Sequence, residues 1–181
     1  LHPRVRRQRQ MCIRDRDKIV VSYVRGVKYL GYSFYVMKGK CQLTVHSNSK
    51  AKMKSRLKEL TSRSNGWGYV KRKQKLKEYI RGWVGYYYLV SMKRLLLETD
   101  EWLRRRIRMC IWKAWKKVKT KVANLIRCGI NKYKAYEWGN TRKGYWRIAD
   151  SYILHRAITN EHLCRAGYAT LMDAYLEWYP K

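Results

Sequence analysis

The sequence has few acidic residues. It contains 12 Asp and Glu against 43 Lys and Arg, a formal net charge of +31 over 181 residues. So much like charge opposes folding unless a polyanion or salt screens it. Residues 141–181 hold six basic and four acidic residues, which leaves +29 on residues 1–140. Nucleic acid is therefore the expected partner, and the first three quarters of the chain is the expected binding region.

Long hydrophobic runs are also missing. No run approaches the roughly 20 apolar residues that a membrane-spanning helix needs. We expect no membrane partner and a cytoplasmic location. The chain is nonetheless 46% hydrophobic, with eight Trp and 16 Tyr, which is enough apolar area for a packed core. A cationic membrane-surface protein is disfavoured because these aromatic residues are dispersed among charges.

Motifs for catalysis and metal binding are absent from the sequence. The five cysteines lie tens of residues apart without a C-x-x-C pair, and the four histidines are scattered. There is no phosphate-binding glycine loop and no Ser or Cys nucleophile motif. The only adjacent acids, Asp100 and Glu101, open an Arg-rich segment and are interpreted as helix caps. We expect no catalytic residue, no metal site, no bound cofactor and no small-molecule substrate on this chain.

The segment Lys52–Val90 has the most distinctive composition. Lysine and arginine alternate there with tryptophan and tyrosine around Arg81-Gly82-Trp83, a combination that suits an RNA surface. The candidate RNA contacts are basic side chains on predicted helices, together with one tryptophan. They are Lys50, Lys54, Arg56, Lys58, Arg63, Lys71, Arg72, Arg81, Arg104, Arg105, Arg108, Trp112, Lys113, Lys116 and Lys117.

Two helices are predicted within residues 47–90. The first begins at an N-cap, Ser47 or Ser49, and runs to about residue 61, with Met53, Leu57 and Leu60 as its buried stripe. The second runs over residues 69–90, basic at first and aromatic later. Gly82 and Gly85 are expected to let another backbone approach it, with Trp83, Tyr86 and Tyr87 around them. Trp83 is interpreted as a core residue rather than a base-stacking platform.

A third helix is predicted over residues 100–119, capped by Thr99. Its spacing predicts two opposite faces. The apolar face comprises Leu103, Ile107, Cys110, Ile111, Ala114 and Val118. The basic face comprises Arg104, Arg105, Arg108, Trp112, Lys116 and Lys119, with the tryptophan exposed for stacking. A merely solvated charged face is the alternative, disfavoured because no acid follows Glu101 until Glu137.

Short antiparallel strands are predicted before these helices. Residues 19–24 read as one strand and residues 27–36 as another, with Leu30, Tyr32, Phe34 and Val36 alternating. A turn at residues 37–40 leads to a third strand at 41–45. After residue 124 we expect short helices broken by glycines, one opening at residues 159–161, and a last one over residues 168–178.

The basic and aromatic segment resembles the maturase-specific domain of group II intron reverse transcriptases. Its first half is carried by Leu57, Lys58, Glu59, Thr61, Arg63 and Ser64, and its second half by Gly82, Trp83, Tyr86 and Tyr87. Gly85 departs from the pattern, because the family usually has asparagine there. In the preceding hairpin, Lys28, Leu30, Gly31 and Phe34 resemble the strand pair with which this family grips a primer. The ending, residues 139–181, is similar to that of bacterial relatives without an endonuclease domain.

The resemblance implies a mainly helical fold preceded by a short antiparallel hairpin. Residues 17–46 would be the last palm strands, 47–122 the maturase-specific helices (thumb, or domain X), and 123–181 a helical annex. The implied function is binding of group II intron RNA to aid splicing. The intact protein would also bind an RNA/DNA duplex and copy RNA into DNA with Mg²⁺. Such a polymerase needs a pair of aspartates, which this sequence lacks, so the chain is interpreted as an inactive fragment. The alternative is a non-enzymatic basic module that packages RNA or DNA or associates with ribosomes.

Residues 1–16 differ in composition from the rest. They contain six arginines and no lysine, and the string MCIRDR at residues 11–16 resembles a translated sequencing adaptor. We expect this leader to be foreign to the protein. The alternative is a native basic arm that binds RNA.

Overall fold

The computed structural model describes residues 23–24 and 27–178, so the basic leader at 1–16 and most of the strand predicted at 19–24 lie outside the described residues. The chain divides into two compact units, Leu1–Ser49 and Lys50–Lys181. The first contains a small antiparallel sheet and the second is helical. The predicted fold class, mainly helical with a short antiparallel sheet before the helices, is confirmed.

The sheet has three antiparallel strands in the order β1-β2-β3. They are β1 (Lys28–Tyr29), β2 (Tyr32–Met37) and β3 (Lys40–Val45). Each connection is a two-residue turn in which both residues have positive φ: Leu30 (50°) with Gly31 (85°), and Lys38 (51°) with Gly39 (74°). Tight hairpin turns of this kind match the right-handed twist of the strands. The position of Leu30 in a strand was therefore predicted wrongly, because Leu30 forms a turn.

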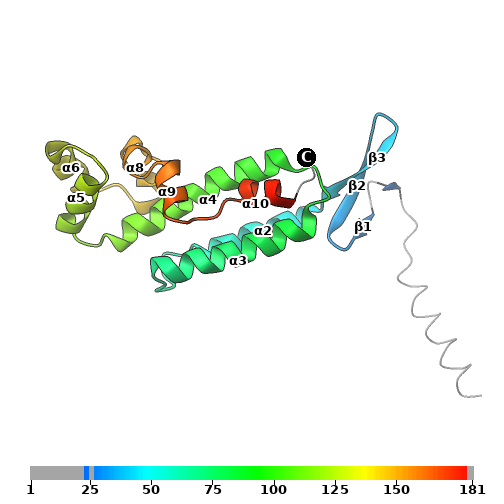
Figure 1. Cartoon of the computed structure of the whole chain (residues 1–181), viewed down its shortest axis with the longest axis horizontal. Coiled ribbons are helices and arrows are strands. Elements are labelled where there is room, and N and C mark those ends of the chain that lie inside the picture. The colour runs from blue at the N-terminus through cyan, green and yellow to red at the C-terminus, as the bar shows by residue number, and fades with distance from the viewer. Residues whose placement is uncertain (1–22, 25–26, 179–181) are drawn as a thin grey trace, which may run out of the picture. The chain divides into compact units, whose positions relative to one another are not determined.

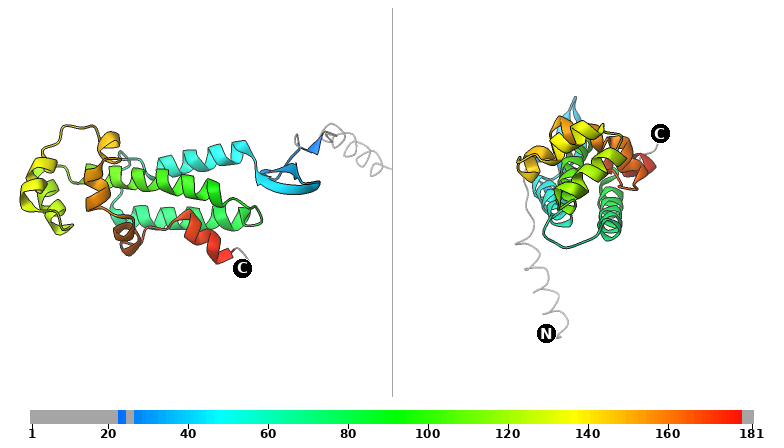
Figure 2. Two further views of the ribbon diagram at one scale, coloured as in Figure 1. Left: turned by 90° about the horizontal axis from the view of Figure 1, so that it is seen from above. Right: turned by 90° about the vertical axis from the view of Figure 1, so that its left-hand side faces the viewer.

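Three long helices lie side by side in the second unit (Figure 1). They are α2 (Ser47–Leu60), α3 (Tyr69–Tyr87) and α4 (Lys93–Ala114). The predicted stripe of α2 is confirmed, since Met53, Leu57 and Leu60 are all buried. Both predicted cap serines lie inside the helix, which begins at Ser47, and the preceding His46 accepts from the Asn48 amide through Nδ1 at 3.1 Å. Both views in Figure 2 place α4 alongside α2 and α3.

The start of α4 differs from its prediction by seven residues. The helix begins at Lys93, and Thr99 lies inside it, donating from Oγ1 to the carbonyl oxygen of Leu95. The other end is Ala114, not residue 119. A buried threonine that bonds back to the preceding turn and a true N-cap have the same sequence signature, which explains the error.

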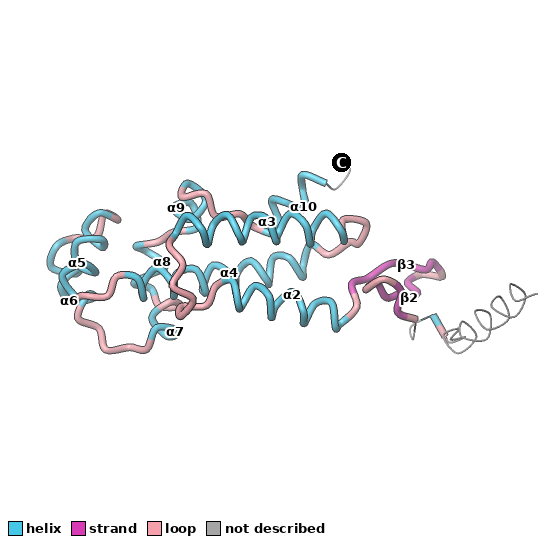
Figure 3. The backbone as a smooth tube through the Cα atoms, turned by 90° about the horizontal axis from the view of Figure 1, so that it is seen from below, coloured by secondary structure: helices cyan, strands magenta, loops and turns pink. Residues whose placement is uncertain are grey.

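Shorter helices follow α4 in the described part of the chain (Figure 3). They are α5 (Val118–Arg127), α6 (Lys132–Gly139), α7 (Tyr145–Ile148), α8 (Tyr152–Ala157), α9 (Asn160–Arg165) and α10 (Leu171–Trp178). The predicted opening of α9 is confirmed, because the Thr159 side chain accepts from the His162 amide at 3.2 Å. The last helix was predicted to begin at Tyr168 and begins three residues later.

The last helix packs back onto the long ones. α10 lies against both α3 and α4. The Tyr175 hydroxyl donates to the carbonyl oxygen of Val90 at 2.9 Å, and both residues are buried. Arg81 of α3 pairs with Glu177 at 3.6 Å. Residues beyond 140 therefore complete the core of the helical unit.

Candidate nucleic-acid interface

The candidate RNA contacts fall into three groups by exposure. Nine basic side chains are exposed, and we call them the exposed cation set: Lys54, Arg56, Lys58, Arg63, Lys71, Arg81, Lys113, Lys116 and Lys117. Three are half-buried: Lys50, Arg104 and Arg105. Three are buried: Arg72, Arg108 and Trp112. The candidates therefore do not form one uniform surface.

The helical pattern explains why the cations of α2 point outward. Met53, Leu57 and Leu60 occupy the buried stripe, so Lys54, between them in sequence, is left in solvent. Arg56 is paired with Glu59 at 2.6 Å, an exposed pair of small energetic weight. Twelve basic and two acidic residues occur between residues 50 and 81. This part of the helical unit can therefore attract a polyanion strongly.

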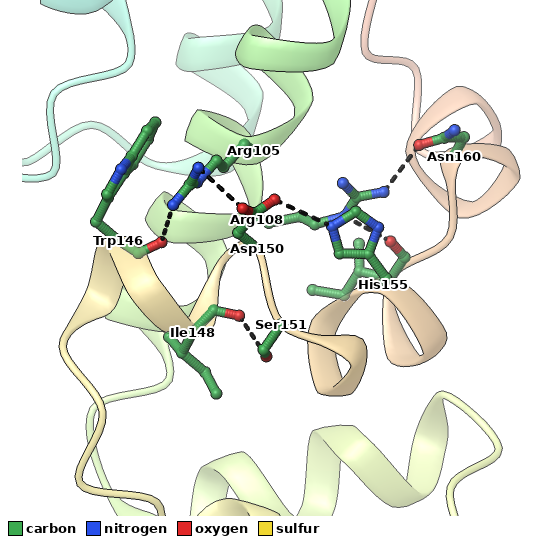
Figure 4. A network of polar contacts seen from close by, with 9 residues as sticks. Arg105, Arg108, Trp146, Ile148, Asp150, Ser151, His155 and Asn160 are labelled. Carbon is green, nitrogen blue, oxygen red and sulfur yellow. Dashed lines mark hydrogen bonds and ion pairs between the residues drawn. The ribbon is translucent and has the colours of Figure 1, made fainter.

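Arg108 is structural rather than exposed. Its Nε donates to the carbonyl oxygen of Ile158 at 2.9 Å, and its Nη2 donates to Oδ1 of Asn160 at 2.8 Å (Figure 4). Burial lowers the pKa of its guanidinium, and the positive charge of Arg104 lowers it further. The prediction of an exposed Arg108 is wrong because the loop between α8 and α9 covers it.

Arg105 is held on three sides. It pairs with Asp150 at 2.9 Å, donates to the carbonyl oxygen of Trp146 at 3.2 Å, and lies over the Trp146 ring, 4.0 Å from the ring centre (Figure 4). Asp150 also lies 3.6 Å from Nε2 of His155. A guanidinium with these partners fixes α7 against α4.

Trp112 does not lie on an exposed basic face. It is 1% exposed, and its ring centre lies 5.8 Å from that of Trp115, while Lys121 from α5 sits over it at 4.8 Å. The expectation of an exposed stacking tryptophan is wrong here because α5 folds back after Ala114. Ala114, on the face predicted to be apolar, is exposed at the last position of α4.

Arg72 is also buried. Its Nη2 donates to Oδ1 of Asn65 at 3.2 Å, which ties the first turn of α3 to the preceding loop. The neighbouring Lys71 is exposed and lies over the Trp67 ring at 5.4 Å. Two adjacent residues of one helix therefore differ in role: Arg72 supports the fold, whereas Lys71 is exposed and can contact a ligand.

The glycines of α3 do not have the predicted role. A side chain at Gly82 would meet no atom within 4 Å, and one at Gly85 would meet only the Trp178 ring, at 3.8 Å. The prediction of a close backbone approach is therefore wrong. Around them, Tyr87 is buried, Trp83 is half-buried with its ring centre 4.7 Å from that of Tyr87, and Tyr86 is exposed.

Sequence reasoning missed Arg106, the most connected arginine of α4. Its Nε donates to Oγ1 of Thr61 at 2.6 Å, and its Nη2 donates to the carbonyl oxygens of Lys58 at 3.0 Å and Thr61 at 3.2 Å. The thiol of Cys110 reaches the same Thr61 oxygen at 3.1 Å. These groups satisfy carbonyls at the end of α2 that lack helical partners. Residues 104–108 contain four arginines, and the sequence alone does not indicate which of them points into the fold.

Sequence reasoning also missed Tyr145. Its ring is contacted by two members of the exposed cation set, Arg63 at 5.2 Å and Lys113 at 5.1 Å from the ring centre. The ring packs on Met109, Cys110 and Ala149. Arg63, Lys113 and Tyr145, from three separate segments of the chain, therefore lie together.

Residues 50–129 match the family model of the group II intron, maturase-specific domain. This stretch, 80 of the 181 residues, is similar to that domain. All fifteen candidate RNA contacts lie within it, whereas Lys28, Leu30 and Gly31 of the hairpin precede it. No curated protein matches the chain significantly.

The helical unit extends beyond the matched residues, since α7 and α10 pack against α4. Among the described residues, no three His, Cys, Asp or Glu side chains gather in a way that could hold a metal ion. Cys41, Cys110, Cys128 and Cys164 are free thiols. No helix in the described part of the chain is long and apolar enough to cross a membrane.

Proposed function

We propose that this protein binds group II intron RNA through its maturase-specific domain and so aids splicing of the intron. The observation that carries the proposal is the match to that domain over residues 50–129. The exposed cation set supports it, because all nine of its side chains lie in solvent within the matched residues. Phosphate contacts by Lys and Arg supply most of the affinity of such surfaces.

The structure selects which cations to test. Arg105 and Arg108 hold neighbouring helices, so replacing them would disturb the fold as well as any RNA contact. Lys54, Lys58, Lys71 and Lys113 are exposed and have no ion pair among the described residues. They are the cleaner probes of phosphate binding.

The test is the salt dependence of binding to a structured intron RNA. Changing Lys54, Lys58, Lys71 and Lys113 together to Ala should weaken binding and flatten the slope of log affinity against log salt. Each lost phosphate contact removes about 0.7 to 0.9 from that slope. The matched control changes four exposed basic residues outside residues 50–129, namely Lys38, Lys40, Lys143 and Arg156. Both variants lose the same charge.

The control separates the two functions considered for this chain. A maturase should lose affinity mainly in the first variant and should keep its preference for intron RNA over an unrelated duplex at raised salt. Equal losses in both variants, with no preference for the intron, would contradict the proposal. That outcome would favour a packaging module instead.

We further propose that the intact protein is a reverse transcriptase used in intron mobility, with β1–β3 as its last palm strands and α2–α4 as part of its thumb. The support is the resemblance of Lys28, Leu30 and Gly31 to a primer-gripping strand pair. In the structure the exposed Lys28 is paired with Ser33, and Leu30 and Gly31 form the adjoining turn. Mg²⁺ does not fit the residues of this chain, which include no aspartate pair. The proposal assigns metal binding to residues outside it.

A further inference from the structure

A small pocket lies where the end of α2 meets α4 and α7. It has a volume of about 340 Å³ and is lined by Ser62, Arg63, Ser64, Arg106, Met109 and Trp146. This volume falls at the small end of the range typical of ligand pockets. Its lining combines two guanidiniums, two hydroxyl groups, an apolar side chain and an indole ring. We call it the Trp146 pocket.

The Trp146 pocket is positively charged, and no acidic side chain in its lining neutralises that charge. Its lining includes Arg63 and Arg106 but no acidic residue. The neighbouring pocket on α4 differs, because Glu98, Glu101 and Asp150 face the arginines there. Arg63 is exposed and has no acidic partner among the described residues. An anion entering the Trp146 pocket therefore meets unneutralised positive charge.

The aromatic wall of the pocket is held in place. Trp146 remains 39% exposed, yet Arg105 lies over its ring at 4.0 Å and Asp150 in turn holds Arg105 (Figure 4). Arg106, on the pocket lining, is fixed by its three bonds to Lys58 and Thr61. Rigid walls reduce the ordering cost of binding a ligand.

We propose that the Trp146 pocket takes one unpaired nucleotide of a bound RNA. The base packs on Trp146 and Met109, and the phosphate lies at Arg63 with the hydroxyls of Ser62 and Ser64. Proteins read unpaired RNA by stacking bases on aromatic rings beside cations. This inference rests on the proposed RNA-binding function and adds a site with a defined preference, single-stranded over paired RNA.

The test compares the whole 181-residue chain with four single variants. Trp146→Ala removes the stacking surface, and Trp146→Phe keeps an aromatic ring. Arg63→Ala removes the proposed phosphate contact. The matched control is Tyr136→Ala, which deletes an aromatic ring that is 53% exposed on α6, outside the pocket. The probes are a fluorescent single-stranded RNA octamer and a blunt RNA duplex, each titrated at several salt concentrations. Thermal melting checks that each variant is folded.

The expected results distinguish stacking from charge. Trp146→Ala should weaken octamer binding by roughly 5- to 150-fold, the range found for loss of one stacked base, with an unchanged salt slope and little effect on the duplex. Trp146→Phe should recover most of the affinity, and Tyr136→Ala should change little. Arg63→Ala should reduce the salt slope for the octamer by about 0.7.

Three other outcomes would count against these proposals. If the unaltered chain binds neither RNA, the proposed function itself fails. If it binds both but folded Trp146→Ala binds the octamer as well as the unaltered chain does, only the nucleotide site is overturned. Equal losses for octamer and duplex would also overturn it, because they would show that the ring does not discriminate unpaired bases.

Discussion

Asp100 of α4 and Leu171 of α10, 71 residues apart, are joined by a 2.8 Å hydrogen bond from the Leu171 amide to Oδ1 of the aspartate. The second oxygen accepts from the Met172 amide at 2.9 Å. Asp100, 2% exposed, therefore caps a helix from a different part of the chain. The sequence pattern had assigned it to the start of its own helix.

Replacing Asp100 tests this cap. Asp100→Ala leaves two amides at the start of α10 without acceptors and should lower the free energy of unfolding by about 0.5 to 2 kcal/mol. Asp100→Asn keeps one acceptor and should cost less. Chemical denaturation of both variants measures the difference. An alanine variant as stable as the asparagine variant would contradict the capping role.

The same residue predicts a pH dependence. Burial raises the pKa of Asp100 above its ordinary value of 3.8, against the lowering effect of the two amide hydrogen bonds. Its folded pKa therefore exceeds its unfolded one, so the folded state holds the proton more tightly. The associated stability is present below pH 3.8 and is lost as the pH rises through the folded pKa. Asp100→Asn should lack this loss, so its stability relative to the unaltered chain should improve as the pH rises through that window. A constant difference across this pH range would refute the prediction.

Arg106 and Thr61 should be energetically coupled. Arg106→Met leaves the Lys58 and Thr61 carbonyls without that donor and should destabilise the domain by about 1 to 3 kcal/mol. Arg104→Met is the matched control on the same helix, since Arg104 is also half-buried. A double-mutant cycle with Thr61→Val should give a coupling energy of roughly 0.5 kcal/mol or more. Purely additive effects would show that the bond contributes nothing specific.

Leu57 and Trp83 should differ in their contribution to stability. Leu57 is fully buried, so Leu57→Ala should cost about 2 to 5 kcal/mol. Trp83 is half-buried, so Trp83→Ala should cost less while leaving the affinity for RNA nearly unchanged. Melting temperatures and RNA titrations measure both. A stable Trp83→Ala variant that no longer binds RNA would assign the ring to base stacking.

The purified chain should not extend a primer on any template with any divalent metal, because its sequence has no aspartate pair to hold the metal ions of phosphoryl transfer. Adding the palm and fingers that the proposal places upstream should produce template-dependent DNA synthesis. A primer-extension assay with a mock-purified control makes the comparison. Synthesis by the 181-residue chain alone would contradict the proposal that its metal-binding residues lie elsewhere.

Periodicity predicted the buried stripe of α2 correctly, because buried side chains must repeat with the helical turn. Met53, Leu57 and Leu60 were found in this way. Periodicity could not show which polar residues are buried, because tertiary partners decide that. Arg108 faces a loop 50 residues away and Asp100 caps a helix 71 residues away, and neither partner has a local signal. The Trp146 pocket was missed for the same reason: its two arginines, Arg63 and Arg106, and its tryptophan lie on separate segments of the chain.

Several residues that contact α4 are synthesised well after the helix itself. This helix is complete at Ala114, but Asp150, Ile158 and Leu171, which hold its polar side chains, emerge from the ribosome later. At roughly 5 to 20 residues per second, the 57 residues from Ala114 to Leu171 take several seconds to add. During that interval the Asp100, Arg105 and Arg108 side chains of a nascent α4 lack these partners. Nascent chains paused in this interval should bind chaperones. Nascent chains whose residue 178 has already emerged from the ribosome should not.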